Sequence, residues 1–176
     1  MSVSYAVIYQ SQTGNTKRIA EAIYEAVKSE RKSLINVNEL DVMPKADVYF
    51  VGFNIHNENC SIEIIDCLEE VQNGYVALFS SCGYVPTDEY KGLIKRKTEV
   101  WLPEGAEYLG MFVCQGRIQE EQRAIMRDHM PDRVEILNKM FDIGDSHPDI
   151  QDYNEAIAFA KSIQSRVERK GNIPVL

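Results

Sequence analysis

Several classes of site are excluded by residues that this 176-residue sequence does not have. Its four cysteines form no Cys-x-x-Cys pair and have no histidine partner at zinc-ligand spacing, so neither a zinc centre nor a dithiol redox pair is indicated. A Cys-x5-Arg phosphatase loop is also missing, because Asp88 and Glu120 stand where the arginine would be needed. We expect free thiols in a reducing compartment at Cys60, Cys67, Cys82 and Cys114.

Long apolar runs and export signals are lacking as well. No segment reaches the ~18 apolar residues of a membrane-spanning helix, and the N-terminus shows no basic or apolar region of a signal peptide. We therefore expect a cytoplasmic protein with no membrane partner. At this length and with 44% hydrophobic residues, the chain is expected to form one domain over residues 1–176, as a monomer or weak dimer.

Basic residues are in the minority, with a formal net charge of −8 and a sequence pI of about 4.9. Proteins that bind nucleic acid usually carry basic patches, so a nucleic-acid partner is not expected. The acidic excess is compatible with attraction of a basic-surfaced redox protein partner. A soluble acidic surface explains the total charge equally well.

The N-terminal stretch has the pattern strand, tight polar loop, helix. Residues 3–9 are apolar, β-branched and aromatic, as in a buried parallel strand, and residues 11–16 offer hydroxyls and bare backbone N–H groups. The apolar residues that follow recur at the spacing of one helix face: Ile19, Ile23, Ala26 and Val27. Such a loop directs unpaired N–H groups and the positive end of the helix dipole at one point, which favours a phosphate.

Other phosphate-binding loops fit this stretch poorly. A P-loop needs a Gly-Lys pair and a dinucleotide fingerprint needs three spaced glycines, and both are absent around Gly14. A receiver domain would need acids at the end of the first strand, where Tyr9 and Gln10 stand. A Ser/Thr turn that only caps a helix remains the alternative.

The loop Ser11-Gln12-Thr13-Gly14-Asn15-Thr16 resembles the phosphate loop of flavodoxins, which binds the ribityl phosphate of FMN. This resemblance implies FMN as the cofactor, with its phosphate held by the hydroxyls and N–H groups of that loop. Gly14 would allow a tight turn or a close approach to the ligand.

The rest of the chain alternates strands with helices, which predicts an α/β fold with a parallel sheet covered on both faces. We expect further strands over residues 34–38, 47–53, 75–80 and 107–114. Helices are expected over residues 16–29, from 60 or 61 toward 74, and over 88–98, 119–130, 134–140 and 151–170, with Pro148 in the first turn of the last one. The resemblance adds a flavodoxin-like three-layer sandwich with the strand order 2-1-3-4-5.

In that topology three loops meet at the carboxyl ends of the strands: residues 10–16, 54–59 and 80–88. The second and third loops would flank the flavin ring, through Asn54, Ile55, His56, Asn57, Ser81, Cys82, Gly83 and Tyr84. Tyr84 is expected to stack on the ring, the alternative being that it packs on its own turn. His56 stands where many flavodoxins have a tryptophan, and either covers the ring or faces solvent.

Two further features bear on the flavin. Asn57 stands near the position where flavodoxins often have a glycine whose peptide flips toward the ring. The acids around loops two and three predict an acidic rim that lowers the flavin potential: Glu58, Glu63, Asp66, Glu69, Glu70, Asp88 and Glu89. Cys114 is interpreted as a core cysteine, a flavin contact being the alternative, and Trp101 as a poor flavin partner.

The segments 114–116 and 146–149 resemble a bacterial flavodoxin-domain branch that includes the flavodoxin-like protein accompanying bilirubin reductase. The leading hypothesis is an FMN-binding electron-transfer protein of the short-chain type, which carries electrons between a reductase or ferredoxin and a partner enzyme. An NAD(P)H-dependent flavin or quinone reductase is the first alternative, although we find no nicotinamide-site signature. A flavin-free interaction module is the second.

Overall fold

The computed structural model describes residues 2–56 and 58–171. Its sheet has five parallel strands in the order β2-β1-β3-β4-β5, which confirms the predicted topology. The strands are β1 (Tyr5–Tyr9), β2 (Lys32–Asn36), β3 (Val48–Asn54), β4 (Gly74–Cys82) and β5 (Ala106–Gln115). β2 is added on one side of β1, and β3, β4 and β5 are added on the other side. Open α/β sheets form their ligand crevice beside the strand where this order of addition reverses, which here is β1.

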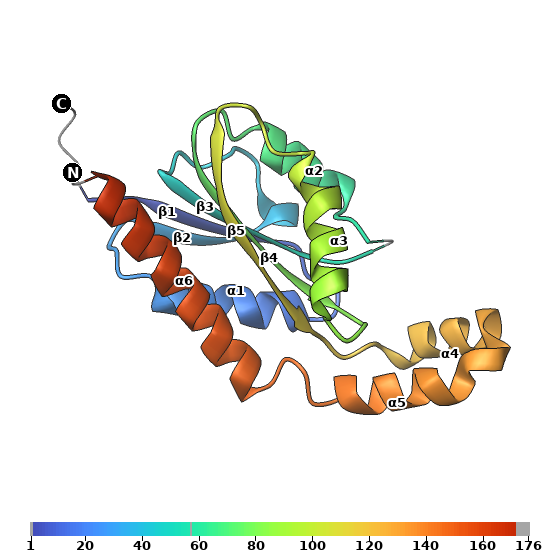
Figure 1. Cartoon of the computed structure of the whole chain (residues 1–176). Helices are drawn as coiled ribbons and strands as arrows, with labels where there is room; N and C mark the ends of the chain where they lie inside the picture. The colour runs from blue at the N-terminus through green and yellow to red at the C-terminus, as the bar shows by residue number, and fades with distance from the viewer. Residues whose placement is uncertain (1, 57, 172–176) are drawn as a thin grey trace.

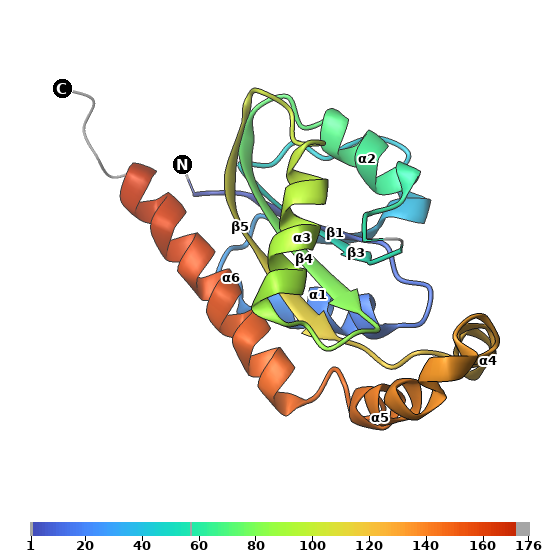
Figure 2. The same cartoon turned by 45° about the vertical axis from the view of Figure 1, so that its right-hand side comes forward.

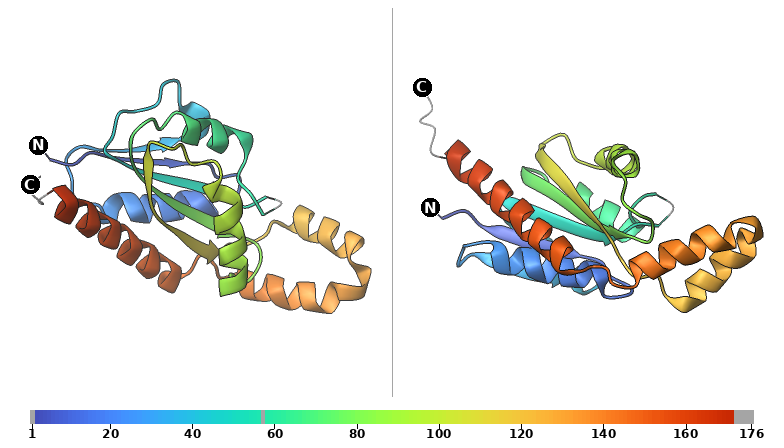
Figure 3. Two further views of the ribbon diagram at one scale, coloured as in Figure 1. Left: turned by 45° about the horizontal axis from the view of Figure 1, so that its top comes forward. Right: turned by 60° about the horizontal axis from the view of Figure 1, so that its bottom comes forward.

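Helices cover both faces of this sheet (Figure 1). On one face α1 (Asn15–Ala26) and α6 (Ile150–Gly171) pack through Ile19, Ile23 and Ile163 onto Val7 and Phe50. On the other face lie α2 (Ile62–Glu69) and α3 (Asp88–Glu99). The turned views in Figures 2 and 3 show the same two helical layers, so the three-layer sandwich is confirmed.

The burial of the strands follows their place in the sheet. Every residue of β1 is buried, since β1 has a neighbour on each edge and helices on both faces. Every residue of β2 is only partly buried, as expected for an edge strand. The strand occupies Lys32–Asn36, two residues before the predicted range, because the Asn36 side chain accepts a hydrogen bond from the Asn38 N–H and starts the 3₁₀ turn Val37–Glu39.

Other element ends also differ from the expectation. Helix α1 ends at Ala26 rather than at residue 29, because Val27 is already extended while its N–H still bonds the Ile23 carbonyl. Strands β4 and β5 extend to Cys82 and Gln115, so their last residues pair with each other beyond the predicted ends. The two strands therefore reach further toward the loops at the carboxyl edge.

A helical hairpin follows β5 and projects from the carboxyl edge of the sheet (Figures 1 and 2). We call α4 (Glu120–His129), the 3₁₀ turn Pro131–Arg133 and α5 (Val134–Gly144) the helical hairpin. Buried Arg123 joins its helices, since its Nε donates to the Ile118 carbonyl at 2.8 Å and its guanidinium pairs with Asp145. The Arg123 guanidinium also lies 5.1 Å from the centre of the Phe141 ring.

The turn between α5 and α6 caps the last helix. Asp149 accepts the N–H groups of Gln151 and Asp152 at 2.8 and 3.0 Å, and the Asp152 carboxylate accepts the Asp149 N–H at 2.9 Å. The Asp152 carboxylate also pairs with His147 Nδ1 at 2.5 Å. Pro148 lies before this cap and not in the first helical turn, because α6 begins at Ile150. Among the described residues no helix has the length and hydropathy needed to cross a membrane.

Candidate functional site

A half-open cavity of about 1040 Å³ lies at the carboxyl ends of the strands. The structure brings together on its walls ten of the predicted site residues: Gln12, Thr13, Asn15, Asn54, Ile55, His56, Ser81, Cys82, Gly83 and Tyr84. Ser11, Gly14 and Thr16 lie in the same loop as Gln12 but do not line the cavity. Asn57 falls outside the described residues.

The first loop is held in place by its own polar side chains. The Ser11 hydroxyl accepts the Gly14 N–H at 3.1 Å, and the Thr16 and Ser81 hydroxyls bond each other at 2.8 Å in a buried position. The Asn15 side chain donates to the Arg117 carbonyl and accepts from Arg18, each at 2.9 Å. Both side chains therefore help to fix the loop, and their contact with an anion stays a prediction.

The first loop has backbone N–H groups that are free to donate hydrogen bonds to a ligand. Gly14 has φ +87°, a left-handed conformation that L residues rarely adopt, and it stands directly before the first residue of α1. No hydrogen bond among the described residues uses the backbone N–H of Gln12, Thr13 or Asn15. Free N–H groups that meet the positive end of a helix dipole form an anion site.

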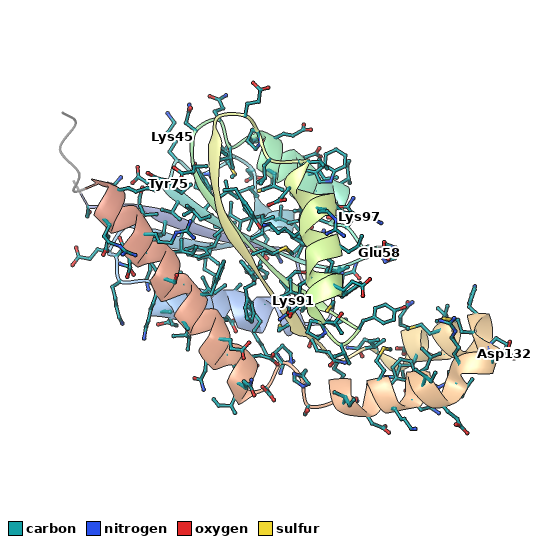
Figure 4. The ribbon with its side chains drawn as sticks, in the orientation of Figure 1. Lys45, Glu58, Tyr75, Lys91, Lys97 and Asp132 are labelled. Carbon is teal, nitrogen blue, oxygen red and sulfur yellow. The ribbon has the colours of Figure 1, made fainter. Side chains whose placement is uncertain are left out.

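The second loop runs from the end of β3 to α2. His56 and Asn59 exchange two backbone hydrogen bonds of 3.0 Å, and Glu58 between them has φ +62°. Among the described residues other than glycine, Glu58 is the one with a positive φ. Figure 4 shows Glu58 and Lys97 of α3 pointing toward each other, and the two side chains form an ion pair.

Trp101 provides a second tether for this loop. Its indole Nε1–H donates to the Asn59 side chain at 3.3 Å, and it packs against the core on the α2 side of the sheet. It is absent from the walls of the cavity, which agrees with the interpretation that it is not a flavin partner. Its position in sequence, far from residue 59, gave no signal of this contact.

The third loop follows β4 and contains a buried thiol. Cys82 bonds the carbonyls of Tyr84 and Cys114 at 3.2 and 3.4 Å, and burial raises the pKa of its thiol to about 12. The thiol stays protonated at neutral pH and is a poor nucleophile. Tyr84 lines the cavity and is 43% exposed, while its ring also packs edge-on against Tyr90 at 5.8 Å.

A fourth wall comes from residues 116–119, which follow β5, and from α4, and sequence reasoning missed it. It consists of Gly116, Arg117, Ile118, Gln119, Glu121, Gln122, Ile125 and Met126. The spacing of Gln122, Ile125 and Met126 is that of one helix face. The rule that ligands meet the carboxyl ends of strands applies to β5 as it does to β1, β3 and β4. Those two signals were available in the sequence.

Close backbone contacts lock this wall onto the predicted loops. A Cβ at Gly83 would lie 2.5 Å from Ile118 Cδ1, and a Cβ at Gly116 would lie 2.6 Å from Asn15 Nδ2. The Gly116 N–H donates to the Cys82 carbonyl at 2.8 Å. The fourth wall is therefore packed against both the first and the third loop.

Comparison with known proteins decides the family, since the model of the flavodoxin domain matches residues 6–161 of this chain. The chain belongs to the flavodoxin domain family. It is 34% identical over 166 residues to a flavodoxin-like domain-containing protein BilS of Clostridioides difficile strain CD3, covering 89% of this chain and 94% of that protein. A BilS protein of Clostridium symbiosum strain WAL-14163 is 24% identical over 168 residues, covering 84% and 88% of the two chains.

A solved structure of a flavodoxin from the domain Archaea has the same fold, with a TM-score of 0.54, 16% identity, and coverage of 94% of this chain and 99% of the other. The predicted family and fold are thus confirmed. Membership in the flavodoxin domain family supports FMN as the cofactor and an electron-transfer role in general.

The residues of the cavity fit that cofactor. The side-chain oxygen of Asn54, at the end of β3, is buried on the cavity wall and accepts no hydrogen bond. A buried amide oxygen without a donor is destabilising, and the ring N–H of an isoalloxazine is a donor of the needed kind. The free N–H groups from Gln12 onward suit a phosphate, so the cavity walls offer complementary groups to both the ring and the phosphate of FMN.

Most of the acids predicted around the flavin do not line the cavity itself. Of the predicted acids only Glu58 lines the cavity, and its charge is paired with Lys97. The other predicted acids are absent from the cavity walls: Glu63, Asp66, Glu69, Glu70, Asp88 and Glu89. Glu63 instead accepts a hydrogen bond from Gln10 at 3.2 Å, and Glu121 of α4 is an acid of the wall that the sequence did not suggest.

Cys114 is a core residue. It is 1% exposed on β5, its thiol lies 3.8 Å from the Ser80 carbonyl, and burial raises its pKa above the ordinary range. It does not line the cavity. The neighbouring Gln115 is also buried and donates to the carbonyls of Gly83 and Met140 at 3.4 Å, which ties α5 to the third loop.

Proposed function

We propose that this chain binds FMN in the cavity and carries electrons between a reductase or ferredoxin and a partner enzyme. The observation that carries the proposal is one cavity whose walls include an N–H-rich anion loop, the buried and unpaired Asn54 oxygen, and Tyr84. Bound FMN supplies the redox chemistry, and the protein supplies its position and its electrostatic surroundings.

The phosphate of FMN is assigned to the loop Ser11–Thr16. The N–H groups of Gln12, Thr13 and Asn15 donate to the phosphate oxygens, and the dipole of α1 favours the negative charge. The internal bonds of Asn15 and Thr16 keep these N–H groups in place, so little ordering is needed when the anion binds.

The isoalloxazine ring is assigned to the space between the second loop, the third loop and α4. Tyr84 supplies an aromatic face, and Asn54, Ile55, His56, Ser81, Cys82 and Gly83 complete the predicted contact set. Asn57, outside the described residues, stays in the set as a prediction. Tyr84 is partly exposed, so a ring that contacts it would lie within reach of a redox partner.

A carrier is favoured over a reductase that oxidises NAD(P)H by itself. The sequence has no dinucleotide fingerprint, and the walls of the cavity show one arginine, Arg117, where a nicotinamide dinucleotide would need further anion contacts. The net charge of −8 favours partners with basic surfaces in the cytoplasm. These two features support the proposal.

The test is a visible spectrum of the purified protein during stepwise reduction, after titration with FMN. We expect saturable FMN binding and a flavin that is reduced by a reductase or ferredoxin system but only slowly by NAD(P)H alone. Bleaching by NAD(P)H at turnover rates would assign the protein to the reductases. A colourless protein that takes up no FMN would leave only the interaction-module hypothesis.

A further inference from the structure

Arg117 leaves the end of β5 directly beside the anion loop. The Asn15 side chain donates to the Arg117 carbonyl at 2.9 Å, and the Arg117 N–H donates to the His147 carbonyl at 3.1 Å. Gly116 approaches Asn15 so closely that a Cβ would lie 2.6 Å from Asn15 Nδ2. The backbone of Arg117 is thus fixed next to the first residue of α1.

The side chain of Arg117 is accessible and only partly neutralised. It lines the cavity, is 63% exposed, and uses its Nε to pair with Asp145 at 3.3 Å, which leaves two amino groups of the guanidinium for another acceptor. Asp145 is shared with the buried Arg123, which is its tighter partner. Because Arg117 and Arg123 share the single carboxylate of Asp145, the three side chains together keep a net positive charge.

A second positive charge contacts Asn15 itself. The guanidinium of Arg18 donates to Asn15 Oδ1 at 2.9 Å. Asn15 of the anion loop thus contacts the Arg18 guanidinium and the Arg117 backbone, and the Arg117 side chain lines the same cavity, on a protein whose formal net charge is −8. A local excess of positive charge on an acidic protein, beside free N–H groups, complements an anion.

We propose that Arg117 binds the phosphate of FMN, as a charged contact from the fourth wall of the cavity that supplements the N–H groups of the loop Ser11–Thr16. This inference rests on the proposed function. The guanidinium donates two hydrogen bonds to phosphate oxygens, while Asp145 holds its Nε and thereby orients it. Arg123 anchors Asp145 and is a positioning residue in this arrangement.

The test compares FMN with riboflavin, which has the same ring and ribityl chain without the phosphate. Both are titrated by quenching of flavin fluorescence into the wild-type protein and into Arg117→Gln, Arg117→Lys and Arg133→Gln. Arg133→Gln removes the same charge from the helical hairpin at its 3₁₀ turn, away from the cavity walls. Each FMN titration is repeated across a series of ionic strengths.

We expect Arg117→Gln to weaken FMN binding about 10- to 100-fold, the range for loss of a charge-assisted hydrogen-bonded pair, and to leave riboflavin binding unchanged. Arg117→Lys should recover part of the loss, and Arg133→Gln should match the wild type. The affinity of the wild type for FMN should fall more steeply with salt than that of Arg117→Gln. The salt series decides the question where riboflavin binds too weakly to be measured.

The inference is overturned if Arg117→Gln leaves FMN affinity and its salt dependence unchanged. It is also overturned if the variant weakens FMN and riboflavin equally with an unchanged salt dependence, because the residue would then act only through the shape of the wall. A wild-type protein that binds neither flavin refutes the proposed function itself, which is a different outcome.

Discussion

The contact between Gly116 and Asn15 allows a quantitative prediction for Gly116→Ala. An added Cβ would lie 2.6, 3.0 and 3.1 Å from the Nδ2, Cγ and Cβ of Asn15. Asn15 is 6% exposed and is held by the Arg117 carbonyl and Arg18, so it has no free direction in which to move. Overpacking costs about 1–3 kcal/mol and loss of the Asn15–Arg117 hydrogen bond about 0.5–1.5 kcal/mol.

We therefore expect Gly116→Ala to lower the free energy of unfolding by about 3 kcal/mol and Tm by roughly 6–12 °C. Urea unfolding measures this as a lower midpoint at an unchanged m value. Gly92→Ala is the matched control, because a Cβ there meets only the flexible end of Arg96 at 3.4 Å within α3. That control should be neutral or more stable by about 0.5–1 kcal/mol.

A double-mutant cycle locates the effect. In an Asn15→Ala background the clash partner is gone, so Gly116→Ala should cost about 1–3 kcal/mol less than it does in the wild type. The reasoning is refuted if Gly116→Ala lies within about 0.5 kcal/mol of the wild type, or if its cost is the same in both backgrounds.

Three further outcomes are expected. Gly14→Val should weaken FMN binding sharply, since it blocks close approach of the ligand to the backbone, and unchanged FMN affinity would remove the phosphate from this loop. Its cost to the free energy of unfolding should come from the left-handed φ of +87°, about 1–2 kcal/mol, because a Cβ there meets nothing within 4 Å. Tyr84→Ala should shift the fluorescence or the potential of bound FMN, and the absence of any shift would take this side chain off the ring. Arg123 lowers the pKa of Asp145 in the folded state below 3.8, so this ion pair stabilises the folded state above that pH and ceases to do so as the pH falls through the folded pKa. Asp145→Asn should therefore flatten this part of a curve of unfolding free energy against pH, and parallel curves for the two proteins would contradict the linkage.

The order of strands and helices could be predicted because each element carries its own periodicity. The buried β1 and the stripe on α1 depend on spacing within a few residues, and both appear as expected. The predicted range of β2 was wrong by two residues, since the Asn36 cap competes with an extended conformation that the local pattern equally allows.

The three predicted loops meet because parallel strands place their carboxyl ends at one edge of the sheet. Their detailed roles were harder to assign. Asn15 and Thr16 have the chemistry of anion ligands, yet they are bound by Arg117 and Ser81, which are 102 and 65 residues away in sequence. Contacts over such separations leave no periodic signal along the chain.

The amino-acid sequence by itself determined the α/β class, the anion loop around Gly14 and its resemblance to flavodoxins, because all three depend on neighbours within one strand–loop–helix unit. Only the tertiary structure decided that α4 packs beside the third loop, that Glu58 is paired with Lys97, and that Arg117 stands beside the anion loop. Those contacts join segments that packing brings together after each has its local shape. The position of charge around the flavin site is therefore a property of the fold, while the binding loop itself is a property of the chain.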